Sequence, residues 1–293
     1  MHRRDFLKMA AAAIPAGLVT SSTAVYAVAV EPTWIQVWRH ALAIPRLPAG
    51  LSGLSVVQLS DIHRSDIVSG PFVREAVERV LSLRPEVVVL TGDFISGDTD
   101  CFRLVAEELA PLAQVAPVFA SMGNHDYDHW YRPVAAGLPH GDRLLGEEFA
   151  RVGIELLVDR GRVVAPRGGA DEIEILGLDD FWKRSFDPEA AFRSLPGNDD
   201  VGRARIVLGH NPDAFAAIQH QRFELALFGH THGGQISLPL VGAPYVPCDD
   251  ARFVSGLVDT GSHLVYTNRG LGYNRRVRFG VRPEITHFTL RPA

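Results

Sequence analysis

The stretch Gly123-Asn124-His125-Asp126 places three different polar side chains in consecutive positions. Asn124 offers a neutral amide oxygen, which suits a hard or borderline metal ion. His125 offers a titratable imidazole, and Asp126 can orient or charge-stabilise that ring. Gly123 has no Cβ, so the backbone can turn tightly or approach a ligand there. Because Gly, Asn and Asp are also ordinary turn residues, this stretch alone does not separate a polar turn from a functional site.

Other segments of the chain repeat the pattern of a buried strand followed by polar side chains. Hydrophobic runs at 55–59, 87–90, 117–120, 205–208 and 225–228 predict interior strands. The side chains of metal-ligand type that follow them are Asp61, His63, Asp93, Asn124, His125, His210, His230 and His232. Since α/β folds gather ligands at the carboxyl ends of their strands, we expect these residues to converge.

Two of these motifs have an i, i+2 spacing, Asp61 with His63 and His230 with His232. In an extended chain, residues two apart point to the same side. We therefore expect each pair to face one centre from an extended backbone.

The rest of the chain alternates between helical and strand patterns. Apolar periodicity predicts helices near 71–83, 102–115, 143–152, 188–195 and 212–221. Further strands are expected at 154–158, 162–165, 173–178, 264–267 and 285–290. Residues 54–293 read as one α/β domain, preceded at 31–53 by a connecting and edge-strand region.

Composition narrows the functional classes. The chain has 293 residues, of which 46% are hydrophobic and 22% charged, as in an ordinary globular protein. A net charge of -5 gives no general attraction to nucleic acid, so no nucleic-acid partner is expected. Cys101 and Cys248 match no zinc or redox spacing, and the sequence leaves open whether they pair.

The N-terminal 30 residues look like a targeting segment instead of part of the fold. Arg3-Arg4-Asp5-Phe6-Leu7-Lys8 precedes an uncharged run from Met9 to Val30, which resembles a twin-arginine export signal. Small residues near Val25-Tyr26-Ala27 favour cleavage there, but the run is also long enough to remain as a membrane anchor. The resemblance implies export by the twin-arginine machinery to the periplasm or the outer face of the cytoplasmic membrane, with a membrane surface as a possible partner.

The strand-end motifs together resemble those of the calcineurin-like metallophosphoesterases. They are Asp61-x-His63, Gly92-Asp93, Gly123-Asn124-His125-Asp126, Gly209-His210 and Gly229-His230-x-His232, in the family's order. Gly233-Gly234-Gln235 and Asn268-Arg269-Gly270-Leu271-Gly272 resemble an exported or membrane-associated bacterial branch. Members of that branch cleave phosphodiesters or the pyrophosphate of UDP-2,3-diacylglucosamine. The resemblance implies a four-layer sandwich of two mixed sheets flanked by helices.

The resemblance also implies a role for each motif residue. Asp61, His63 and His232 would hold one divalent ion, Asn124, His210 and His230 a second, and Asp93 would bridge the two. His125 would face the substrate as a catalytic residue, with Asp126 holding its ring. Two such ions, about 3.5–4 Å apart, lower the pKa of a bridging water and attract an anionic phosphate. Nitrogen and oxygen ligands allow Mn, Fe, Zn, Co or Ni.

The substrate is the least determined feature. Solvated charge on strand edges is the favoured interpretation of the C-terminal arginines, Arg269, Arg275, Arg276, Arg278 and Arg282. The alternative is a rim that binds a second phosphate or an anionic head group, for which Arg269, in a glycine-flanked loop, is the best candidate. Phe181-Trp182 could contact a base or an acyl chain, but core packing is the favoured interpretation. A small-molecule or lipid-linked phosphodiester or pyrophosphate is the expected substrate. A phosphomonoesterase and a non-catalytic metal-binding envelope protein are the alternatives.

Overall fold

The computed structural model describes residues 22–96, 99–127, 140–183, 185–195 and 202–293. Most of the predicted targeting segment, residues 1–21, lies outside these ranges. Within them, no helix has both the length and the apolar character needed to cross a bilayer.

The first sheet has six strands in the order β1-β12-β2-β3-β4-β5. They are β1 (Gln36–Ile44), β12 (Glu284–Pro292), β2 (Leu54–Leu59), β3 (Val87–Thr91), β4 (Val118–Ser121) and β5 (Ile154–Leu156). β12 runs parallel to β1 and antiparallel to β2, and the strands from β2 to β5 are parallel. The region 31–53 therefore supplies the edge strand of this sheet.

The second sheet also has six strands, in the order β10-β11-β9-β8-β7-β6. They are β10 (Gly256–Asp259), β11 (Leu264–Thr267), β9 (Leu225–Phe228), β8 (Arg205–Leu208), β7 (Ile173–Gly177) and β6 (Arg160–Val164). The four central strands are parallel, and the two edge strands are antiparallel to their neighbours. Both sheets are therefore mixed.

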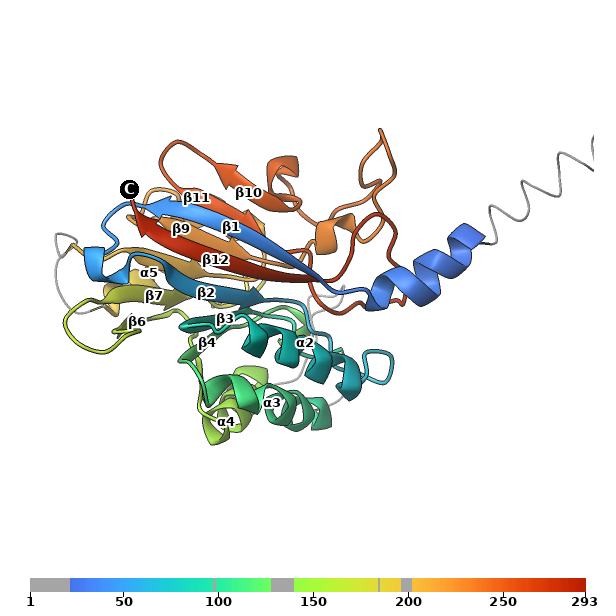
Figure 1. Cartoon of the computed structure of the whole chain (residues 1–293), viewed down its shortest axis with the longest axis horizontal. Helices are drawn as coiled ribbons and strands as arrows, with labels where there is room; N and C mark the ends of the chain where they lie inside the picture. Colours follow the sequence, from blue (N-terminus) through green and yellow to red (C-terminus); the bar gives the residue numbers. More distant parts are fainter. Residues whose placement is uncertain (1–21, 97–98, 128–139, 184, 196–201) are drawn as a thin grey trace, which may run out of the picture.

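Helices cover the outer faces of the two sheets (Figure 1). α2 (Gly70–Ser82), α3 (Asp100–Ala113) and α4 (Gly141–Arg151) pack on the first sheet, and α5 (Pro188–Arg193) and α6 (Phe215–Ile218) on the second. A third apolar cluster fills the space between the sheets. The predicted four-layer sandwich is confirmed.

The hydrophobic strand runs exist because both faces of each sheet are covered. In β3, Val88 and Leu90 pack under the helices, while Val87 and Val89 face the other sheet. A strand buried on both faces reads as continuously apolar instead of alternating. This is why the interior strands could be located from the sequence.

Two elements differ from the sequence prediction. The helix expected over 212–221 consists of a 3-10 turn, Pro212–Ala214, and the single turn α6. The apolar side chains Phe215 and Ile218 are buried, whereas residues 219–222 are polar and partly or fully exposed, so no continuous helical face extends further. The strand β10 was not predicted, because it is a four-residue edge strand that buries little of its surface.

Replacing Phe288 with alanine should test the packing between the sheets. Phe288 is fully buried in the central cluster and lies edge-on to Tyr266, with ring centroids 5.1 Å apart. We expect Phe288→Ala to lower the free energy of unfolding by about 3–5 kcal/mol, measured by urea denaturation. The exposed control Val115→Ala should change it by less than about 0.5 kcal/mol. Equal midpoints for the two variants would contradict this assignment of the core.

Candidate metal centre

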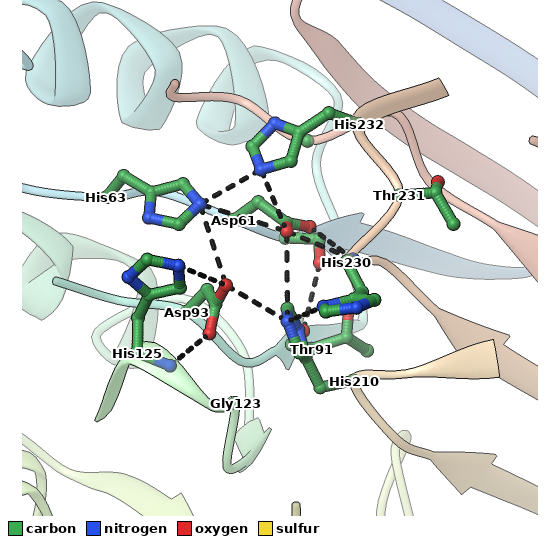
Figure 2. Close-up of polar contacts among 12 residues, drawn as sticks. Asp61, His63, Thr91, Asp93, Gly123, His125, His210, His230, Thr231 and His232 are labelled. Atoms are coloured by element: carbon green, nitrogen blue, oxygen red, sulfur yellow. Dashed lines mark hydrogen bonds and ion pairs between the residues drawn. The ribbon is translucent and has the colours of Figure 1, made fainter. Parts of the chain in front are cut away.

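The carboxyl ends of β2, β3, β4, β8 and β9 meet at one end of the sandwich, and the loops that follow them carry the predicted ligands. The seven predicted metal ligands are all buried; they are Asp61, His63, Asp93, Asn124, His210, His230 and His232. Six of them form two groups of three, and the ligand atoms of each group lie within 4.8 Å of one another (Figure 2). The seventh, Asn124, directly precedes the 3-10 turn His125–Tyr127 in the loop after β4.

One group of ligand atoms comes from Asp61, His63 and His232. The His63 and His232 Nε2 atoms are 3.0 Å apart. The Asp61 Oδ1 atom lies 3.4 Å from His232 Nε2 and 4.0 Å from His63 Nε2. These three atoms lie close enough together to hold one ion, which is the grouping that the family resemblance implied.

A second group comes from Asp93, His210 and His230. The His230 Nδ1 and His210 Nε2 atoms are 3.1 Å apart. Asp93 Oδ2 lies 3.0 Å from His210 Nε2 and 3.6 Å from His63 Nε2, so its carboxylate touches a ring of each group. Figure 2 shows Asp93 between the two sets of histidines.

The backbone of these loops differs from the extended chain that was predicted. Asp61 and His63 have φ values of 51° and 52°, and His230 and His232 have values of 69° and 49°. The pairs converge because both members adopt the left-handed conformation, so the extended-strand explanation for their spacing is wrong. Non-glycine residues in this region are strained by about 1–3 kcal/mol each and concentrate at functional sites.

Glycines beside the ligands permit the close approach of the loops. A Cβ on Gly229 would lie 1.9 Å from Ser60 Oγ and 2.3 Å from Asp61 Oδ2. A Cβ on Gly123 would lie 2.3 Å from Asp93 Oδ1. The glycines that precede the ligand residues in these motifs therefore have a steric reason to be there.

Hydrogen bonds orient two of the rings toward the cluster. His63 Nδ1 lies 2.6 Å from Ser96 Oγ, whose proton goes to Asn274 Oδ1 at 2.7 Å. His210 Nδ1 donates to the Thr91 carbonyl at 2.9 Å. In both residues, Nδ1 carries the proton and Nε2 is directed at the carboxylates, the arrangement common among metal-binding histidines.

The histidines of the cluster have different pKa values because their surroundings differ. Burial lowers the pKa values of His63 and His232 well below the usual value and that of His230 to about 3, so these rings stay neutral. Burial would also lower the pKa of His210, but Asp93 and Asp61 outweigh it and raise the value to about 10. Burial opposes ionisation of Asp93, yet His210 and His125 hold its pKa well below the usual value.

Asp126 does not hold the His125 ring, so that prediction is wrong. Its Oδ2 atom accepts hydrogen bonds from the backbone N–H groups of Asp93 and Gly123, and its Oδ1 atom accepts one from Phe94. The carboxylate therefore joins the loop after β3 to the loop after β4. A short side chain in a turn satisfies nearby backbone donors more readily than it reaches the ring of the preceding residue.

His125 lies at the edge of the cluster beside two polar side chains that the motifs did not include. Its Nε2 atom is 3.3 Å from Asn274 Nδ2 and 3.9 Å from Asp93 Oδ2, and its Nδ1 atom is 3.4 Å from Ser96 Oγ. Ser96 and Asn274 thus position both His63 and His125. Sequence reasoning missed them because neither belongs to a motif that follows a predicted interior strand, although Asn274 follows Asn268-Arg269-Gly270-Leu271-Gly272 closely.

The arginines near the C-terminus have different environments. The Arg269 guanidinium lies over the Trp38 ring at 4.5 Å and 3.8 Å from Glu284 Oε2, so substrate binding by Arg269 stays a prediction without a supporting contact. Arg278 is fully buried and donates to the carbonyls of Gly270 and Gly272 beside His232. Arg278 is therefore a structural cation, not solvated charge.

The segment after β7 forms another wall of the cluster. Trp182 is half-exposed and stands edge-on to His230, with ring centroids 4.8 Å apart. Core packing, which was favoured for Phe181-Trp182, is therefore wrong for Trp182, while Phe181 does pack beside Phe186. Asp180 is buried in the same segment, where burial raises its pKa to about 7.

The donor set fits a pair of divalent cations. Two nitrogen ligands at about 2 Å from one ion lie roughly 3 Å apart, which matches both imidazole pairs. Each pair is accompanied by a carboxylate, and Asp93 is shared. Left-handed backbone at five ligand residues further indicates a conformation held for binding.

Comparison with known proteins agrees with this geometry. The model of the family described as calcineurin-like phosphoesterase matches residues 54–234. The chain belongs to the calcineurin-like phosphoesterase family. It is thus a metallophosphoesterase, a hydrolase of phosphate esters, and its strand-end loops bring together His and Asp side chains that could hold metal ions.

Several relatives match along nearly the whole chain. Phosphodiesterase YaeI of Escherichia coli is 35% identical over 291 residues, covering 99% of both chains. Uncharacterized metallophosphoesterase YkuE of Bacillus subtilis is 32% identical, over 99% of this chain and 98% of the relative. UDP-2,3-diacylglucosamine pyrophosphatase LpxG of Chlamydia trachomatis is 29% identical, covering 90% of this chain and 91% of that one. Among solved structures, a dimetal phosphatase from Danio rerio aligns with a TM-score of 0.44 at 13% identity, over 81% of this chain and 99% of that one.

Adding one methyl group at Gly229 should damage the centre without replacing any predicted ligand. The new Cβ would displace the Asp61 carboxylate, so Gly229→Ala should lose at least about tenfold in metal affinity, as disruption of supporting groups does. Metal content after dialysis, measured by mass spectrometry, checks this. Gly202→Ala is the matched control, because nothing lies within 4 Å of its Cβ position. Full metal occupancy in Gly229→Ala would contradict the prediction, because it would show that the loops can move apart without a loss of metal affinity.

Proposed function

We propose that this metallophosphoesterase cleaves phosphodiester or pyrophosphate bonds, with a lipid-linked nucleotide such as UDP-2,3-diacylglucosamine among its candidate substrates. The observation that carries the proposal is the position of Asp93 Oδ2, which touches His210 of one ligand group and His63 of the other. A single carboxylate shared by two groups suits two cations that act on one phosphate.

Each ligand residue has a defined part in this proposal. Asp61, His63 and His232 would hold one ion, and Asn124, His210 and His230 the other, with Asp93 between them. When bound, the two ions supply Lewis acidity and an activated water for attack on phosphorus. Ser96 and the Thr91 carbonyl would keep Nε2 of His63 and His210 directed inward.

His125 is the proposed catalytic residue outside the ligand set. Its ring lies edge-on to His63 at 4.8 Å between centroids and is partly exposed, so it can meet a substrate from the solvent side. There it would stabilise the charge that develops on phosphate and donate a proton to the leaving oxygen. Ser96 and Asn274 would hold the ring in place.

Two observations support a substrate with two esterified groups. The relatives that match nearly the whole chain include a phosphodiesterase and a UDP-2,3-diacylglucosamine pyrophosphatase. The half-exposed Trp182 ring beside His230 offers a flat apolar surface for a base or an acyl chain. A panel of bis(p-nitrophenyl) phosphate, p-nitrophenyl phosphate and UDP-2,3-diacylglucosamine would test the choice. Faster turnover of the monoester would favour a phosphomonoesterase, and no turnover with both metals bound would favour a binding protein.

We also propose export by the twin-arginine route to the periplasm or the outer face of the cytoplasmic membrane. Arg3-Arg4 and the uncharged run from Met9 to Val30 support this proposal. A Lys-Lys replacement of Arg3-Arg4 that left export unchanged in a reporter fusion would contradict it.

Substitutions should separate the metal ligands from the catalytic residue. His125→Ala should retain two metals and lose about 10²–10⁴-fold in turnover of bis(p-nitrophenyl) phosphate. Asp93→Asn should lose both metal content and turnover, because the shared negative charge is removed. His220→Ala, on the exposed surface, serves as the control and should be unchanged. Loss of metal from His125→Ala would instead make His125 a ligand, and full activity of Asp93→Asn would exclude the bridging role.

Metal uptake at pH 7 should release roughly one proton or more per chain. Against the effect of burial, Asp93 and Asp61 raise the pKa of His210 to about 10, so this imidazole must lose a proton before Nε2 can bind an ion. The apparent affinity should therefore rise as the pH increases through neutrality. Titration calorimetry with Mn²⁺ in buffers of different ionisation enthalpy measures the protons released. A heat that does not depend on the buffer would rule out this coupling.

A further inference from the structure

Exposed apolar side chains concentrate in two segments of the described protein. The first is the N-terminal helical segment 22–34, in which Val25, Val28, Val30 and Trp34 are 44–61% exposed. The second is the segment 235–248, in which Leu238, Leu240, Val241 and Tyr245 are 42–108% exposed. Neither 22–30 nor 235–248 contains a charged residue.

The tip of the second segment is a tight hairpin with its apolar residues outward. Leu238 and Gly242 exchange backbone hydrogen bonds of 2.9 Å, which leaves Leu240 at the turn. Leu240 is fully exposed and has a φ of 66°, a conformation that strains a leucine. A fully exposed leucine with a strained backbone does not stabilise the fold. Its position indicates that the side chain contacts a partner.

The two segments form one surface because both pack on residues 278–280. Ser237 N–H donates to the Phe279 carbonyl at 2.7 Å, on the hairpin side. Arg278 N–H donates to the Ala27 carbonyl at 2.9 Å, and Tyr26 stands edge-on to Phe279, on the helix side. In Figure 1 the blue helix and the orange hairpin project from the same end of the molecule.

This end also carries the loops of the metal centre. The hairpin segment starts three residues after His232, and Gln235 N–H donates to the His232 carbonyl at 2.9 Å. Residues 243–245 lie against Gly234, where a Cβ would be 2.2 Å from Ala243 Cβ. The apolar surface therefore borders the loops that hold the predicted ligands.

We infer that this surface, formed by Val25, Val28, Trp34, Leu238, Leu240 and Val241, docks on an anionic lipid bilayer. The chain that continues from the helix toward the N-terminus is uncharged back to Met9, and residues 9–30 are about long enough to cross a bilayer. The exposed Arg275 and Arg276 lie two to three residues before 278–280, where they can meet lipid phosphates. Trp34, with Arg282 stacked 3.4 Å over its ring, has the amphipathic character of interfacial aromatics.

The contacts of the first segment also favour its retention in the mature protein. Ala27 is buried, and the Glu31 carboxylate, 1% exposed, accepts a hydrogen bond from Val281 N–H at 2.6 Å. Cleavage near Val25-Tyr26-Ala27 would remove the Tyr26 ring from Phe279 and one wall of the docking surface. In this proposal the segment stays as an anchor and orients the metal centre toward the bilayer.

A fluorescent label at the hairpin tip tests the inference in the full chain. Leu240→Cys and, as the matched control, Val115→Cys are made in a Cys248→Ser background and labelled with the fluorophore NBD. Val115 is 57% exposed but lies between α3 and β4, at the opposite end of the sheet. With vesicles of phosphatidylcholine and phosphatidylglycerol, the emission at position 240 should shift to the blue and rise severalfold, and that at 115 should not change. Vesicle affinity should fall about tenfold or more without the anionic lipid.

Three results would overturn the docking surface. They are an unchanged spectrum at position 240, equal shifts at 240 and 115, and a shift at 240 that appears with rising protein concentration in the absence of vesicles. The last would indicate that a second copy of this chain covers the surface.

The consequence for catalysis rests on the proposed function and has a separate readout. Leu240→Asp should leave turnover of bis(p-nitrophenyl) phosphate unchanged, since the hairpin contains no proposed ligand. Its turnover of UDP-2,3-diacylglucosamine embedded in vesicles should fall about tenfold, while Val115→Asp should match the unmodified chain. Loss of both activities would indicate that Leu240→Asp is misfolded, which urea denaturation would reveal. The label experiment would then be the test of the docking surface. A full vesicle rate in Leu240→Asp would show that docking at this hairpin does not present the substrate.

Discussion

The structure depends on burying a dense group of ligand atoms at one end of two sheets. Four imidazole nitrogens and two carboxylates lie within a few ångströms of one another and are almost completely excluded from water. Such an arrangement is unfavourable unless opposite charges compensate it, because desolvated charges and polar atoms require partners. A protonated His210 supplies part of that compensation, because it lies between Asp93 and Asp61, which are 3.0 and 4.0 Å away. Divalent cations would replace that proton.

The fold provides this density through tight loops and not through the strands themselves. The sheets are rigid because apolar side chains cover both faces, and their parallel strands deliver successive loops to a common end. The loops after β2, β3 and β9 turn back sharply through left-handed residues. Glycines such as Gly123 and Gly229 let the backbone come within contact of neighbouring ligands. Asp126 joins two of these loops by accepting three backbone hydrogen bonds. The local strain is tolerated because many contacts with the surrounding core fix the positions of the loops.

The same end of the molecule combines a polar centre with an apolar rim. Trp182 stands beside His230, and the uncharged hairpin leaves the chain directly after His232. The segment 278–280 ties the hairpin to the N-terminal helix, and the buried Arg278 ties the same region to the carbonyls of Gly270 and Gly272. The loops that hold the predicted ligands and the segments that carry the apolar surface are thus neighbours at one end of the fold.

The sequence by itself determined the interior strands and the identity of the clustered residues. Runs such as Val87 to Leu90 are apolar on both faces, and ligand-type residues follow them at fixed offsets, so periodicity and chemistry are both local signals. The tertiary structure alone decided the partners of side chains whose contacts are distant in sequence. Asp126 binds the loop after β3, Arg269 lies over Trp38 on β1, and Ser96 meets Asn274 across 178 residues. It also decided the left-handed backbone at Asp61 and His230, because that conformation is imposed by the packing of loops against one another and leaves no periodic trace in the sequence.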